Sequence, residues 1–309
     1  MKSNKISIIA ATLLLVGLVV FGVGFAMTGF NLSKLSTEAE FIEKSFVSPS
    51  GVSGIVIEDS NIAVKIIASP DDKVHVTYFE NDKEFYEISQ SKSGTLVITK
   101  KNDRKWYDYI FNLRFQSVHL TVAVPGNFSG DLSVKSSNSP IDASDIKAAN
   151  ILLDSSNARI TASNVSVSAK FKASTSNGAI TLSKVTALGD IVCDSSSGGI
   201  TLDQVEGNTI ETDTSNQDVV LTSVVSNDRI AIKTSNASIA FNDIQFKTGL
   251  DCYTSNGVVK GSLLGKLSDY TITSKTSNRK NDLPENQSGG AKTLVIETSN
   301  APIVIGFMG

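Results

Sequence analysis

The sequence predicts an all-β protein, a parallel β-solenoid of about nine coils of roughly 20 residues, preceded by one transmembrane helix. Three features support this fold: a triplet that recurs every 19 to 22 residues, an apolar/polar alternation on both sides of it, and an uncharged apolar segment near the N-terminus. A period of this length is typical of solenoids, in which each repeat forms one coil and buries its apolar residues against its neighbours.

The recurring triplet is Ser-Ser-Asn or Thr-Ser-Asn, and Ser195-Ser196-Ser197 takes its place once. We number each repeat from the last residue of its triplet, which is position 0. The asparagines at position 0 are Asn138, Asn157, Asn177, Asn216, Asn236, Asn256, Asn278 and Asn300.

Before the triplet, apolar residues alternate with polar ones. Position −6 is apolar in every repeat, as in Leu132 and Phe171, and position −4 is never charged. Positions −5 and −3 often carry charged residues, such as Lys172 and Asp194. A period of two is that of a β-strand with one buried face, so a strand with its even positions inward is predicted here.

After the triplet, the odd-numbered positions become the inward ones. Positions +3 and +5 are mostly apolar, as in Ile180 and Leu182, and a further parity change leads to an apolar residue at +8, such as Val185. A parity change requires a corner, and the small residues at position +1, such as Gly178 and Ala237, fit a sharp bend. We therefore expect about three short faces and two or three corners in each coil.

The hydroxyl at position −2 and the asparagine at position 0 are predicted to lie on the inner side of a corner, where polar groups need partners. Coils stacked about 4.8 Å apart bring like side chains within reach of one another. The asparagine amides can then form a hydrogen-bonded ladder. The alternative is a binding track for a ligand or for ice, and the inward parity favours the structural ladder.

Residues Ile6 to Met27 are uncharged and long enough, as a helix, to cross a hydrocarbon core of about 30 Å. Lys2 and Lys5 precede them, so we expect residues 1–5 in the cytoplasm, a single pass over residues 6–27, and the C-terminal part outside the cell membrane. The alternative is a cleaved secretory signal, whose apolar core is normally shorter and ends in a small-x-small site. Residues 28–50 are predicted to form a juxtamembrane stalk.

Residues 51–130 are predicted to form an N-terminal β capping region, and residues 131–309 the solenoid repeats. The capping strands are irregularly spaced, as expected for the end of a solenoid. An insertion from Lys101 to Gln116 gathers aromatic residues that are scarce elsewhere in this part of the chain. It is predicted either to plug the open end or to bind a partner, through Trp106, Tyr107, Tyr109, Phe111 and Arg114.

The sequence contains no nucleophile motif and no Cys-His pattern with metal spacing, so neither catalysis nor a metal or cofactor is expected. The net charge is −3 and charges of both signs are mixed along the chain, so the sequence shows no basic patch of the kind that binds nucleic acid. Acidic residues at position −3 are interspersed with lysines, which predicts a solvated face.

Cys193 and Cys252 share position −4 three coils apart, a separation of about 14 Å. Because a disulfide reaches only about 7 Å, two buried free thiols are predicted.

The apolar segment, the strand end Val124-Pro125-Gly126 and the triplet-bearing coils together resemble a bacterial family. This is the β-strand-repeat domain of unknown function labelled "putative adhesin", in the membrane-anchored form found beside envelope-stress-response genes. The resemblance covers roughly residues 51–309. It implies a right-handed β-solenoid outside the cell, with no catalytic residues to carry over.

These features predict a non-enzymatic, membrane-anchored extracellular β-solenoid for adhesion, envelope-stress sensing or scaffolding. Its expected contacts are the membrane, through its own anchor, and a cell-envelope protein or polysaccharide. The alternative is a cell-surface polysaccharide-binding protein, or a degenerate polysaccharide-active β-helix protein. An outward groove with stacked aromatic side chains or paired acids would favour this alternative.

Overall fold

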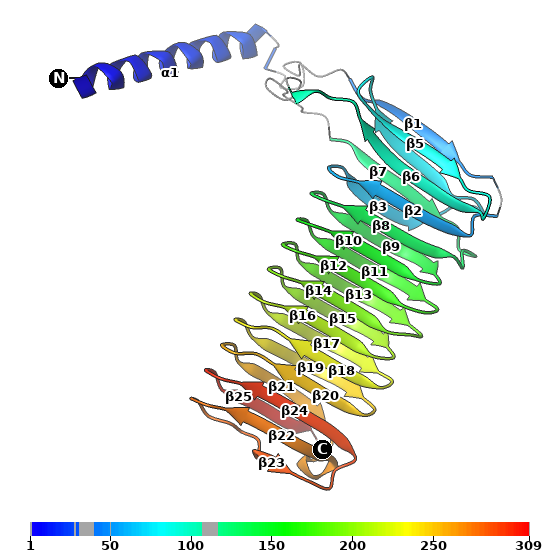
Figure 1. The fold of residues 1–309 in the computed structure, drawn as a ribbon, viewed down its shortest axis with the longest axis vertical. Helices are drawn as coiled ribbons and strands as arrows, with labels where there is room; N and C mark the ends of the chain where they lie inside the picture. The colour runs from blue at the N-terminus through cyan, green and yellow to red at the C-terminus, as the bar shows by residue number, and fades with distance from the viewer. Residues whose placement is uncertain (1, 28, 31–39, 50, 107–116, 309) are drawn as a thin grey trace. The chain divides into compact units, whose positions relative to one another are not determined.

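The computed structural model describes residues 2–27, 29–30, 40–49, 51–106 and 117–308 (Figure 1). The chain divides into two compact units. The first comprises Met1–Glu43, Phe79–Phe85 and Lys101–Val118, and the second comprises Lys44–Tyr78, Tyr86–Lys100 and His119–Gly309.

The first unit contains helix α1 (Lys2–Met27). Its segment Ser7–Met27 has a mean hydropathy of 2.7 and is long and apolar enough to cross a membrane. A helix that is apolar around its whole circumference suits a lipid surrounding better than water. The same unit holds an ion pair in which Nε of Arg104 lies 2.6 Å from Oε1 of Glu84, with both side chains almost completely buried.

The second unit is built mainly from two large, predominantly parallel sheets. The first sheet has the spatial order β1 (Ile42–Val47), β4 (His75–Glu80), β7 (His119–Val124), β3 (Ala63–Ala68), β9 (Ile141–Ala148), β11 (Ile160–Val167), β13 (Ile180–Ala187), β15 (Ile200–Gly207), β17 (Val219–Ser226), β19 (Ile239–Phe246), β21 (Val259–Leu264) and β25 (Ile303–Met308).

The second sheet contains the shorter strands that precede the triplets. Its spatial order is β23 (Asn286–Gln287), β22 (Tyr270–Thr276), β24 (Lys292–Thr298), β20 (Gly249–Tyr253), β18 (Arg229–Lys233), β16 (Ile210–Thr214), β14 (Ile191–Ser195), β12 (Phe171–Thr175), β10 (Ile151–Ser155), β8 (Asp131–Ser136), β2 (Gly54–Asp59), β6 (Thr95–Asn102) and β5 (Glu84–Gln90).

From β10 to β19 the chain alternates between the sheets, so that each coil adds one strand to each of them (Figure 1). Equivalent positions are in register: Ile151, Phe171 and Ile191, all at position −6, stack on one another. Positions −6 and −4 of one sheet and +3, +5 and +8 of the other are buried almost throughout. The predicted inward parity is therefore confirmed, and the core lies between two sheets of a solenoid-like fold.

The expectation of three faces per coil is wrong, because the second parity change occurs inside the longer strand. The residue at position +7 of six coils adopts a left-handed backbone conformation within that strand, with φ between 51° and 58°. This bend turns the following residue inward without ending the strand. The six residues are Asp145, Asn164, Lys184, Gln204, Ser223 and Asp243.

At both ends of the second unit, the spatial order of the strands departs from their order in the chain. Strand β24 lies between β20 and β22, although β22 precedes it in sequence. Likewise β2 lies between β6 and β8. Strands β2 and β3 continue the coil register, with Ile55 beside Leu132 and Val64 beside Ile141.

Candidate functional site

The corners after the shorter strands are held by the hydroxyls at position −2. Oγ of Ser195 accepts a hydrogen bond from the N–H of Gly198 at 2.9 Å and donates to the carbonyl oxygen of Gly178 in the preceding coil at 3.1 Å. Thr175 and Thr214 donate in the same way to the coil before them. These hydroxyls are buried, as their parity predicts, and each joins its turn to the coil before it.

The asparagines at position 0 form a ladder, but its position corrects the sequence-based expectation. All eight are exposed rather than on the inner side of the corner, because the −2 hydroxyl already fills the inside of the turn. Each amide bonds along the corner, with N···O distances of 2.7 Å from Asn177 to Asn157 and 2.9 Å from Asn236 to Asn216. The ladder bonds run through Asn138, Asn157, Asn177, Asn216, Asn236, Asn256, Asn300 and Asn278, with Asn216 bonded to the backbone of Ser196 where the asparagine is missing.

The ladder also extends to a coil that the sequence analysis missed. The amide of Asn138 donates to Oδ1 of Asn61 at 2.8 Å. Asp59-Ser60-Asn61 is a triplet with aspartate at position −2, and Asp59 accepts hydrogen bonds from the N–H groups of Asn61 and Ile62. Allowing a carboxylate in place of the hydroxyl would have revealed this repeat, because apolar residues also occupy its inward positions.

Outside the corner, the serines at position −1 and the side chains at position −3 line two hollows along the same row of coils, which we together call the corner groove. Its acidic section has a volume of about 430 Å³ and contains Asp154, Asp194 and Asp213 together with serines of the −1 row. The sequence analysis did not place this groove, although a serine at position −1 of every triplet was its visible signal.

Within the acidic section, Asp194 and Asp213 occupy paired positions on β14 and β16. Burial raises the pKa of Asp213, the neighbouring Lys233 opposes this, and the charge of Asp194 adds to the rise. Asp194 also lies 3.3 Å from Nζ of Lys172. The predicted solvated face therefore includes two like charges on adjacent strands, which is unfavourable without a counter-charge.

The other part of the corner groove, its tyrosine section, has a volume of about 310 Å³. Its walls carry one aromatic residue, three charged residues and the serines of the −1 row. The side chains that distinguish it are Lys233, Tyr253, Glu297 and Lys275, in the spatial order of β18, β20, β24 and β22.

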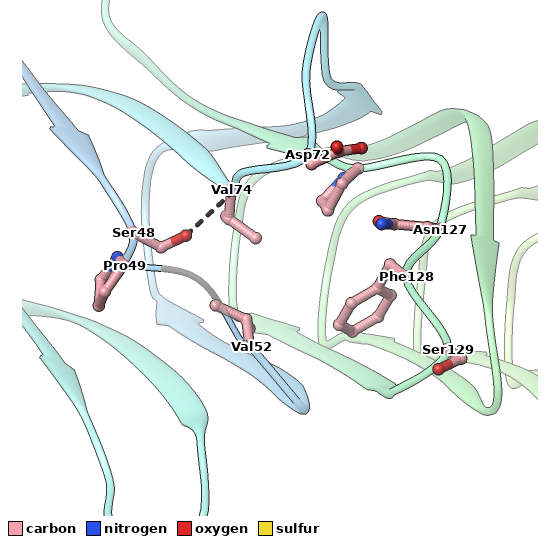
Figure 2. A pocket seen from close by; sticks show the side chains of 10 residues that line it. Ser48, Pro49, Val52, Asp72, Val74, Asn127, Phe128 and Ser129 are labelled. Carbon is pink, nitrogen blue, oxygen red and sulfur yellow. Dashed lines mark hydrogen bonds between the residues drawn. The ribbon is translucent and has the colours of Figure 1, made fainter.

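A separate hollow of about 180 Å³ lies near the N-terminal end of the second unit (Figure 2). The side chains of Val52, Val74 and Phe128 converge on it, and the N–H of Val74 donates to Oγ of Ser48 at 3.1 Å. Asp72 is the charged residue in its lining. The combination of an apolar floor and one carboxylate matches no catalytic constellation.

Of the aromatic insertion, only part lies within the described residues. Trp106 is 76% exposed, whereas Tyr107, Tyr109, Phe111 and Arg114 lie outside the residues that the structure describes. Their proposed contact with a partner stays a prediction.

Both cysteines are free and buried, as predicted. Burial strongly raises the pKa of both thiols, of Cys193 and of Cys252, so the thiolate form is disfavoured. Within the described ranges, no three His, Cys, Asp or Glu side chains are grouped closely enough to hold a metal ion.

The parallel coils, their corner ladders and the groove define a β-strand-repeat protein. Residues 52–173 match the family model described as Toastrack DUF4097. Over that part of the chain, this match confirms the predicted resemblance to an uncharacterised repeat domain. No curated protein matches the chain.

Three solved structures show a distant likeness to the chain. A putative adhesin from Bacteroides fragilis is 12% identical, with a TM-score of 0.45, covering 88% of this chain and 98% of its own. A putative adhesin from Parabacteroides distasonis is 14% identical, with a TM-score of 0.43 and the same coverage. A putative lipid binding protein from the latter organism is 12% identical, with a TM-score of 0.41, covering 86% and 97%. Likeness at this distance does not indicate a function.

Proposed function

We propose that the protein is a non-enzymatic β-solenoid, anchored in the cell membrane and facing outward, that serves in adhesion or as a scaffold or stress sensor of the cell envelope. The main support is the surface that the stacked coils present. Hydroxyl, amide and charged side chains repeat along the coils at the spacing of paired strands, about 4.8 Å. Such a surface suits contact with an extended partner better than enclosure of a small substrate.

The anchoring belongs to the same proposal. The apolar segment of α1 remains uncleaved and crosses the membrane once, with its lysine-flanked N-terminus in the cytoplasm. The coils wind right-handedly and number about nine. The length of the segment supports an anchor over a signal peptide, whose apolar core is normally about 7–15 residues.

Proximity labelling in intact cells tests the adhesive or scaffolding function. The full chain, carrying a labelling enzyme at its C-terminus, should label envelope proteins and remain accessible to protease added outside. A variant lacking residues 101–116 tests whether the aromatic insertion selects the partner. Labelling of cytoplasmic proteins alone would contradict the proposal, and unchanged partners in the deletion variant would exclude the insertion as the binding site.

A second candidate function, binding of a cell-surface polysaccharide, is favoured by the corner groove. The groove pairs Asp194 with Asp213 and carries an aromatic side chain, Tyr253, among serine hydroxyls. Glycan-binding surfaces combine an apolar ring face with polar groups that hold hydroxyls. Retention of the full chain on a column of purified cell-wall glycan, with release by free glycan, would support this function; passage without retention would contradict it.

A further inference from the structure

Tyr253 is unusual in its surroundings. Rows −5, −3, +4 and +6 face outward from the two sheets, and between residues 131 and 308 Tyr253 is their sole aromatic member. Its side chain is 38% exposed. The residues stacked beside it at position −3 are Lys233 and Glu297. A large ring among charged side chains gains little from burial here, so its contribution to folding does not explain its presence.

Charged side chains lie close to the phenol of Tyr253. Asp251, two residues earlier on the same face of β20, is 7% exposed and forms an ion pair with Nη2 of Arg229. Its second oxygen, Oδ1, is buried and has no hydrogen-bond partner. Burial, then the charges of Asp251 and Glu297, raise the pKa of the Tyr253 phenol. The phenol therefore stays protonated and can donate a hydrogen bond at neutral pH.

The charges around the ring balance one another. Lys233 lies between Asp213 and Tyr253 in the −3 row, and Lys275 lies beside Glu297. A polyanion would therefore meet Glu297 and a polycation would meet both lysines, so a ligand of either charge faces repulsion in this section. A neutral ligand with many hydroxyl groups meets donors and acceptors along the whole section instead.

The shape of the section indicates an extended ligand. The serines at position −1 are stacked coil on coil, and the backbone of Ser255 bonds to that of Ser235 at 3.0 Å. Their exposed hydroxyls therefore form a straight row along the groove, beside the ring of Tyr253. A straight chain of sugar residues can place one ring on the aromatic face and its hydroxyls along this row.

We propose that the tyrosine section of the corner groove binds a neutral, β-linked glycan, with one pyranose ring packed against Tyr253. Lys233, Lys275 and Glu297 hydrogen-bond its hydroxyl groups, and the serines of the −1 row contact the neighbouring sugars. This inference rests on the proposed polysaccharide-binding function and assigns its site and its ligand class.

The test measures binding of three hexasaccharides to the full chain in lipid nanodiscs by titration calorimetry. The probes are cellohexaose, chitohexaose and the anionic hexamer of galacturonate. We expect the wild type to bind at least one of the neutral probes. Tyr253→Thr, which keeps a β-branched residue on the strand, should weaken that binding at least about tenfold, because it removes the stacking surface. Tyr253→Phe should retain it within about fivefold, the loss expected for a single hydrogen bond.

Leu188→Ala is the control, since it removes an exposed apolar side chain outside the groove and should leave the affinity unchanged. The inference is overturned if neither neutral probe binds, if the galacturonate hexamer is preferred, or if Tyr253→Thr binds like the wild type with an unchanged unfolding midpoint. If cell-wall glycan is still retained in any of these cases, polysaccharide binding survives and only this site or ligand class is excluded.

Discussion

At the corners of Thr175, Ser195 and Thr254, a single buried hydroxyl satisfies two backbone groups that belong to different coils. The bonds of Ser195 to Gly198 and to Gly178 are an example. The hydroxyl is therefore a joint between coils as well as a cap of its own turn. Because its partners are buried backbone groups, removal leaves both of them without a partner.

We predict that Ser195→Ala lowers the free energy of unfolding by about 1–3 kcal/mol, the range for leaving buried polar groups unsatisfied. Chemical denaturation followed by circular dichroism measures the change. The control is Ser196→Ala, which alters the exposed neighbour at position −1 and should change stability by less than about 0.5 kcal/mol. Equal effects of the two substitutions would contradict the role of the buried hydroxyl.

Asp213 makes stability depend on pH. Its pKa is raised above the ordinary value of 3.8, so the folded protein holds this proton more tightly than the unfolded chain. The stability it contributes is therefore present below the ordinary pKa and is lost as the pH rises through the raised, folded-state pKa.

We predict that Asp213→Asn is more stable than the wild type at pH 7 and that this advantage disappears below about pH 3.5, where the wild-type carboxyl is protonated. Denaturation midpoints between pH 3 and pH 7 measure the difference. Lys233→Ala should act in the opposite direction at pH 7, because Lys233 lowers the pKa of Asp213. Parallel pH profiles for wild type and Asp213→Asn would disprove the assignment.

At the scale of strands, the inward side chains of neighbouring coils are matched in size, and their strands are in register. Phe241 on β19 is buried at position +5, where the three preceding coils have leucine, and Gly261 takes the same position on β21. A Cβ atom on Gly261 would lie 2.2 Å from Cδ2 of Phe241. The large ring of one coil therefore fills space that the glycine of the next coil leaves.

This pairing predicts a non-additive double mutant. Gly261→Leu alone should destabilise the protein by about 1–3 kcal/mol through overpacking, and Phe241→Leu alone by a similar amount through a cavity. The double variant should recover at least half of the summed loss, because it restores the leucine stack of Leu182, Leu202 and Leu221. Denaturant titration of the four proteins measures the coupling, and strict additivity would contradict the size match.

The inward positions of the strands could be predicted from the sequence, but the bend inside the longer strands could not. Inward positions such as Phe171 and Ile180 are visible because burial imposes an apolar residue in every coil. The left-handed residues at position +7 were not visible, because aspartate, asparagine, lysine, glutamine and serine all occupy them. The stacked coils impose this conformation on residues that do not share a single preferred type, so no signature appears in the sequence.

At the scale of the whole molecule, the second unit contains its own core, and the apolar helix belongs to the first. We predict that a protein lacking residues 1–40 is soluble without detergent and unfolds within about 2 °C of the full chain in detergent, since the solenoid core is intact. Differential scanning calorimetry of both proteins tests this. A drop of more than about 5 °C would mean that the removed segment stabilises the coils.

The groove was harder to predict than the coils. Its floor and rim come from residues such as Asp194 and Asp213, which are distant in sequence and meet only through the register of parallel strands. A charge at position −3 looks like an ordinary solvated residue when each repeat is considered alone. The asparagine ladder was expected, but its outward position depends on the local turn, which the period of the repeat does not specify.

The exchanged order of strands at the two ends affects when the protein can fold. In the middle, each coil meets the coil made just before it, so assembly can follow the emerging chain. Strand β22 must wait, because the strand that lies between it and the finished coils, β24, emerges later from the ribosome. Strand β6 has no such delay, because its partner β2 precedes it in the chain. The C-terminal end therefore closes last, and a chain stalled before β24 would present uncapped coils to proteases.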